Sequence, residues 1–154
     1  MSFGTTEPNN AVLRTFVEKY RQLCAPDHVF WCDGSEAERD HLTRAALERG
    51  IFTELNQQKL PGCYYHRSNP NDVARVEQCT FICTPTADEA GPTNNWRDPA
   101  DTYEMLHGLL AGAMKGRTLY VVPYLMGPAG SPLTKVGIEI TDSIYVVLNM
   151  RIMT

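Results

Sequence analysis

The sequence predicts an α/β domain, with a mixed sheet and flanking helices. Segments with helical periodicity alternate with short runs of β-branched and aromatic residues, and no internal repeat is present. The chain has 154 residues, of which 43% are hydrophobic and 21% charged. This length and composition suffice for one folded domain with a single core.

The first expected element is a helix that ends at about Cys24. Asn9 or Asn10 can cap its N-terminus, and Pro26 prevents its continuation. A short apolar strand is then expected at 28–33. The helix places its apolar side chains at helical spacing, which predicts one packed face: Val12, Leu13, Phe16, Val17, Tyr20 and Leu23.

A second helix is expected at about 36–49. Gly34 and Ser35 turn the chain into it, and Gly50 closes it. Ser35 is a candidate N-cap with Glu38 three residues later, which is the spacing of a capping box.

The second half of the chain alternates strands and loops. The polar segment 85–99 is expected to be a long loop, and loops of that length are usually functional or form an interdomain surface. The expected regular elements are a strand at 80–84, a helix at about 100–114, and strands at 118–124 and 136–141.

Composition excludes several classes of protein. The formal net charge of −4 gives no basic surface for nucleic acid, and no apolar run reaches the roughly 18 residues of a membrane span. The N-terminus lacks the features of a secretion signal or an Arg-rich transit peptide. The five cysteines are odd in number and include no C-x-x-C pair. Reduced thiols and a cytoplasmic location are therefore expected.

Common catalytic motifs are absent from the sequence. There is no phosphate-binding G-x-x-x-x-G-K-[ST] loop and no G-x-S-x-G nucleophile elbow. The four histidines lack metal-ligand spacing, so no metal site is predicted from them: His28, His41, His66 and His107.

Arg75 and Glu77 are the candidate functional residues of the segment DVARVE. In an extended run these two side chains share one side, two residues apart. An arginine at a strand entrance can bind a carboxylate with two donors, but an exposed ion pair with Glu77 or Asp72 is the commoner reason for such spacing. Spacing alone therefore favours the ion pair.

A resemblance favours the first interpretation. The blocks CDGSEAE, DVARVE, TFICT, DEAGPTNNW and GAMKGRTLYVVPYLMGPAGSPLTKVGIEITDSIYVVLNMRIMT resemble the N-terminal part of GTP-dependent phosphoenolpyruvate carboxykinase. They occur in the family's order between residues 27 and 154. The resemblance implies the N-terminal, substrate-binding lobe of a two-lobed enzyme.

That family converts oxaloacetate and GTP reversibly to phosphoenolpyruvate, GDP and carbon dioxide, as a decarboxylating lyase of gluconeogenesis or anaplerosis. The resemblance implies Mn²⁺ at the catalytic centre, Mg-GTP as nucleotide and a monomeric parent enzyme. Arg75 would grip the carboxylate of oxaloacetate or phosphoenolpyruvate, and Glu77 would support the architecture beside it.

The resemblance also implies that most of the machinery is missing. The family's metal ligands, phosphate loop, lid and guanine pocket correspond to nothing in residues 1–154, and the chain ends inside an apolar run without a stop signal. We therefore expect a truncated lobe that is inactive alone. The loop between the last two strands would contact the missing lobe, leaving an exposed apolar patch: Tyr124, Leu125, Met126 and the run from Ile144 to Met153.

Two alternatives remain open at this point. The chain can be a stand-alone, non-catalytic carboxylate-binding or regulatory module. It can also be a small enzyme that uses the thiol of Cys79 or Cys83, although buried strand cysteines are usually inert packing groups.

Overall fold

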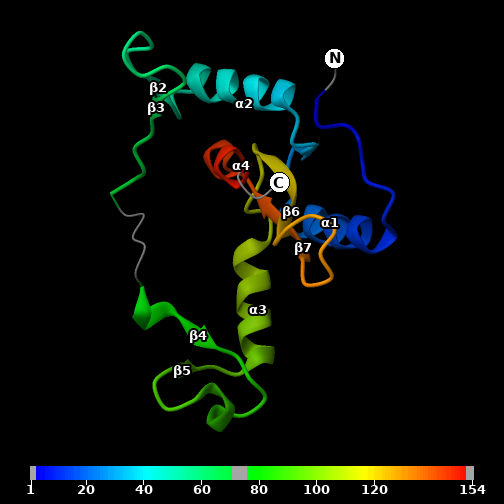
Figure 1. Ribbon diagram of the computed structural model, residues 1–154. Helices are drawn as coiled ribbons and strands as arrows, with labels where there is room; N and C mark the ends of the chain where they lie inside the picture. The colour runs from blue at the N-terminus through cyan, green and yellow to red at the C-terminus, as the bar shows by residue number, and fades with distance from the viewer. Residues whose placement is uncertain (1–2, 71–75, 152–154) are drawn as a thin grey trace.

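The computed structural model describes residues 3–70 and 76–151, and a three-stranded mixed sheet forms its centre (Figure 1). Strand β6 (Thr118–Met126) lies between β1 (His28–Trp31) and β7 (Lys135–Thr141). It pairs parallel with β1 and antiparallel with β7. The prediction of a mixed sheet is therefore confirmed. Each of its three strands begins and ends within two residues of the positions expected from the sequence.

One face of the sheet packs against helix α1 (Ala11–Cys24). Leu119 and Val121 of β6 point to this face and are fully buried with Val17 and Trp31. As expected, Asn10 caps the helix, because its side-chain oxygen accepts the Leu13 N–H at 3.1 Å.

The other face packs against α2 (Glu36–Glu48) and α4 (Ile144–Met150). Tyr120 and Val122 point to this side. Because β6 is buried on both faces, its sequence is a nearly continuous apolar run rather than an alternating one. The core on this face comprises Leu42, Ala46, Tyr120, Val122, Ile144 and Val147.

Helix α4 corrects the expectation of an exposed apolar terminus. Ser143 caps the helix by accepting the Val146 N–H, and the side chains of Ile144 and Val147 are each only 1% exposed. The expectation was wrong for these residues because the helical turn directs both of them onto the sheet. Leu125 and Met126 do remain exposed.

Helix α3 (Pro99–Leu110) ends four residues earlier than the sequence predicts. Gly112 adopts a φ of 70°, and its N–H donates to the Leu23 carbonyl at 2.8 Å. The Met114 N–H likewise donates to the Cys24 carbonyl at 2.9 Å. The chain leaves α3 because the end of α1 binds the following turn.

The remaining elements form small ribbons outside the central sheet. Strands β2 (Thr53–Glu54) and β3 (Tyr64–Tyr65) pair antiparallel. Strand β4 (Phe81–Ile82) pairs parallel with β5 (Asn95–Trp96), at the end of α3 away from the central sheet (Figure 1). Among the described residues, no helix has the length and apolar character needed to cross a membrane.

Candidate functional site

Arg75, the predicted substrate-binding residue, lies outside the described residues. Glu77 is described, and the expectation of an extended run is wrong for it. It begins the short 3₁₀ helix η1 (Glu77–Cys79), in which the Thr80 N–H donates to the Glu77 carbonyl. The Glu77 carboxylate is exposed and contacts no partner among residues 3–70 and 76–151.

Asn95 fixes the segment that contains Glu77. Its side-chain amide donates to the carbonyls of Glu77, at 3.0 Å, and Thr80, at 3.2 Å. The sequence predicted only a loop at 85–99, but within it β5 pairs with β4 and the 3₁₀ helix η2 (Ala87–Ala90) forms. The loop is thus ordered around the segment that follows Arg75.

Trp96 and Arg97 add two further contacts to this ribbon. The Trp96 indole N–H donates to the Thr84 carbonyl at 2.9 Å, and the Arg97 guanidinium lies over the Phe81 ring at 5.4 Å. We name η1, β4, η2 and β5 together the arm. Its order comes from side-chain to backbone bonds rather than from a core, since most of its residues are exposed.

We predict that Asn95→Ala loosens the arm without unfolding the domain. Loss of two exposed hydrogen bonds should cost about 1 kcal/mol locally. Hydrogen exchange at the Thr80 and Arg97 amides should accelerate about fivefold. Asn94→Ala is the matched control, because the Asn94 amide donates to Ala90 instead. Equal exchange in the two variants would contradict the role given to Asn95.

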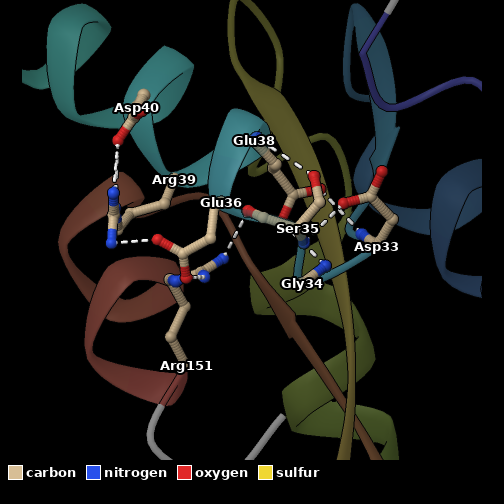
Figure 2. Close-up of polar contacts among 8 residues, drawn as sticks. All are labelled: Asp33, Gly34, Ser35, Glu36, Glu38, Arg39, Asp40 and Arg151. Atoms are coloured by element: carbon tan, nitrogen blue, oxygen red, sulfur yellow. Dashed lines mark hydrogen bonds and ion pairs between the residues drawn. The ribbon is translucent and has the colours of Figure 1, made fainter.

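A second polar site lies where β1 turns into α2 (Figure 2). Ser35 caps α2 as predicted, with its hydroxyl oxygen accepting the Glu38 N–H at 3.1 Å. The reciprocal bond differs from the predicted capping box. The Glu38 carboxylate accepts the N–H groups of Asp33, at 2.7 Å, and Gly34, at 3.2 Å, rather than that of Ser35.

The carboxyl groups of Asp33 and Glu38 have shifted pKa values in opposite directions. Burial raises the pKa of Glu38, which is 1% exposed, although the N–H groups of Asp33 and Gly34 oppose this shift. Hydrogen bonds from Ser35 lower the pKa of Asp33. Of these two carboxyl groups, Glu38 is therefore the more readily protonated and Asp33 the more readily ionised.

Arg151, at the end of α4, connects α4 to this turn by hydrogen bonds. Its guanidinium donates to the Ser35 carbonyl at 2.9 Å and to the Glu36 carboxylate at 3.1 Å (Figure 2). Glu36 also pairs with Arg39. No sequence pattern indicates this role of Arg151, because its partners lie more than 100 residues earlier in the chain.

A cavity of about 290 Å³ lies beside the turn, and Cys32, Glu38, Val122, Val147 and Arg151 contribute to its walls. Burial raises the pKa of the Cys32 thiol. The thiol form is therefore favoured at neutral pH, and this cysteine is a poor nucleophile.

The two cysteines considered as nucleophiles lie elsewhere. Cys79 and Cys83 were expected to be buried in a strand, but both are exposed, because the strand is only two residues long. The Cys83 sulfur lies 3.7 Å from the Thr102 hydroxyl oxygen. All five cysteines are free.

The described part of the chain offers no ligand set for a metal ion. Within it, no three side chains of the types His, Cys, Asp and Glu gather closely enough to hold one.

Comparison with known protein families identifies this mixed α/β domain as a carboxykinase domain. The model of the phosphoenolpyruvate carboxykinase N-terminal domain matches residues 15–154, and the chain belongs to that family. It is 59% identical over 145 residues to "Phosphoenolpyruvate carboxykinase [GTP]" of Anaeromyxobacter sp. (strain K). Proteins of the same name from Neocallimastix frontalis and Chlamydia trachomatis are 49% and 53% identical.

These matches cover almost all of the chain but only part of each relative. They include 94%, 99% and 92% of the chain in the three cases, and 24%, 25% and 24% of the relatives. The chain thus spans about a quarter of the length of the curated relatives that it matches.

Proposed function

We propose that the chain is the N-terminal, substrate-binding lobe of a two-lobed GTP-dependent phosphoenolpyruvate carboxykinase. The parent enzyme would interconvert oxaloacetate plus GTP with phosphoenolpyruvate, GDP and carbon dioxide, as a cytoplasmic monomer. The observation that carries the proposal is the 59% identity, over 94% of the chain, to a protein named for this activity.

The lobe's proposed task is to hold the substrate carboxylate. Arg75 lies in the block DVARVE, two residues before Glu77 in the sequence, and its planar guanidinium can bind a carboxylate with two parallel hydrogen bonds. Glu77, exposed two residues later, would support this arrangement. The bonds by which Asn95 holds η1 support the proposal, because they order the segment that carries Glu77.

Under this proposal Mn²⁺ and Mg-GTP bind to groups beyond residue 154. Metal and nucleotide would supply the charge stabilisation on which phosphoryl transfer depends. The isolated chain should therefore form no phosphoenolpyruvate from oxaloacetate, GTP and manganese. Turnover above background in that assay would refute this division of roles.

A second lobe would cover the apolar surface of this one. Tyr103 and Leu109 of α3 are 63% and 70% exposed, and Leu133 and Val136 of the β6–β7 hairpin are 84% and 76% exposed. A contiguous exposed apolar patch of more than a few hundred Å² is typical of a contact surface, and these side chains would belong to such a patch. This supports the assignment of residues 1–154 to an incomplete lobe.

We predict that Arg75→Lys impairs the complete enzyme specifically toward oxaloacetate. Lysine keeps the positive charge but cannot form the bidentate hydrogen bond to the substrate carboxylate. The kcat/KM for oxaloacetate should therefore fall about 10- to 100-fold. The KM for GTP should not change. Arg14→Lys, on the exposed side of α1, is the matched control.

An equal loss in the two variants, or a loss confined to GTP, would contradict the role of Arg75. A different outcome would favour the stand-alone module. In that outcome the 154-residue chain would bind small dicarboxylates tightly, and Arg75→Ala would abolish the binding. In addition, the chain would be found in cells only by itself and not as part of a larger protein.

A further inference from the structure

A cavity of about 380 Å³ lies under the N-terminal segment of the chain, remote from the turn of Figure 2. Residues 3–5 form a strap along the free edge of β1, where the Trp31 N–H donates to the Gly4 carbonyl at 2.9 Å. Gly4 has a φ of 72°, and a Cβ there would lie 2.4 Å from the Phe30 ring. Glycine therefore allows the strap to close directly over Phe30.

Three basic side chains line this cavity: His28, His41 and Arg49. No carboxylate is among the lining residues, and none of the three forms an ion pair within the described parts of the chain. The cavity is therefore bordered by basic N–H donors, and no carboxylate lines it.

The acidic residues next to these positions in sequence are occupied elsewhere or lie outside the cavity. The Asp27 carboxylate accepts the Gly116 N–H at 3.0 Å, and the Asp40 carboxylate binds Arg39. Glu48 is exposed and does not line the cavity. The lining itself thus carries the positive charge of Arg49 and no carboxylate, which favours a negative group.

Aromatic rings form the rest of the wall. The Phe3 ring stacks on the His41 ring at a centroid distance of 4.6 Å, and the Phe30 ring lies 5.4 Å from that of Tyr120. Tyr120 is 3% exposed. Burial raises the pKa of its phenol, opposed by the positive charge and hydrogen bond of Arg49. The guanidinium thus lies where the polar and aromatic parts of the wall meet.

We propose that this cavity binds a small organic carboxylate with an aromatic or branched apolar body. The Arg49 guanidinium and the imidazole N–H groups would bind the carboxylate. Phe3, Phe30 and the Tyr120 ring would contact the apolar body, as in most small-molecule sites. The inference does not depend on the proposed carboxykinase activity.

The test uses sodium benzoate as the probe, with benzyl alcohol as its uncharged analogue. Benzoate should shift the imidazole NMR signals of His28 and His41 at millimolar concentration, and benzyl alcohol should not. Arg49→Gln should weaken benzoate binding at least about tenfold, equivalent to about 1.4 kcal/mol. Arg44→Gln, an exposed arginine of α2 that does not line the cavity, should bind like the wild type.

Arg75→Ala should also bind benzoate like the wild type, which separates this site from the proposed substrate site. His28→Asn provides a second variant and should weaken binding about threefold. Unchanged histidine signals with benzoate would overturn the proposal. So would equal binding of benzyl alcohol, binding of inorganic phosphate alone, or unimpaired binding by the Arg49→Gln and His28→Asn variants.

Discussion

Replacing Ile144 by alanine is expected to lower the free energy of unfolding by about 3–4 kcal/mol. Ile144 is 1% exposed and lies in the core that α2 and α4 form with β6. Truncation removes buried methyl and methylene groups and leaves a cavity that the tightly packed neighbours cannot fill. Urea unfolding followed by circular dichroism measures the effect.

Leu133→Ala is the matched control for this substitution. Leucine has the same number of carbon atoms as isoleucine, but Leu133 is 84% exposed. Its truncation should change the unfolding free energy by no more than about 0.5 kcal/mol. Similar effects of the two variants would mean that α4 does not pack on the sheet as described.

Replacing Glu38 by alanine should cost about 2–3 kcal/mol. The Asp33 and Gly34 N–H groups would lose a charged acceptor, and hydrogen bonds to charged groups contribute about 1.5–3 kcal/mol each. The variant also avoids the free-energy cost of burying a carboxylate, and this offsets part of that loss. Glu48→Ala, near the exposed end of the same helix, should have little effect in the same urea experiment.

Glu38→Gln should change how stability depends on pH. The folded-state pKa of Glu38 is raised above the ordinary value of 4.5, so the folded protein holds this proton more tightly than the unfolded chain. The stabilisation is fully present below pH 4.5 and is lost as pH rises through the raised pKa.

The stability of the wild type relative to Glu38→Gln should therefore fall as pH increases across this range. An increase with pH would show that the two backbone N–H groups outweigh burial in setting the pKa of this carboxyl. Urea unfolding of both proteins at several pH values between about 4 and 7 distinguishes the two results.

The arm shows where local sequence signals were insufficient. The segment 85–99 is polar and rich in turn residues, which predicts a loop, and yet β5 forms within it. The pairing depends on Asn95 and Trp96 meeting carbonyls 12 to 18 residues earlier. Contacts at that separation leave no periodic pattern in the sequence.

The sequence by itself determined the local elements and the family. The caps of α1 and α2, the three strands of the central sheet and the mixed α/β class all follow from side-chain periodicity and from residues that stop or start a helix. The family follows from blocks of sequence that extend over most of the chain.

Only the tertiary structure decided which of these residues act together. It buried Ile144 and Val147 on the sheet, joined Arg151 to Ser35 and Glu36, and gathered His28, His41 and Arg49 around one cavity. The physical reason is that burial and charge compensation depend on neighbours in space. Those neighbours depend in part on the pairing of β1 with β6, in which His28 and Thr118 are partners 90 residues apart in the chain.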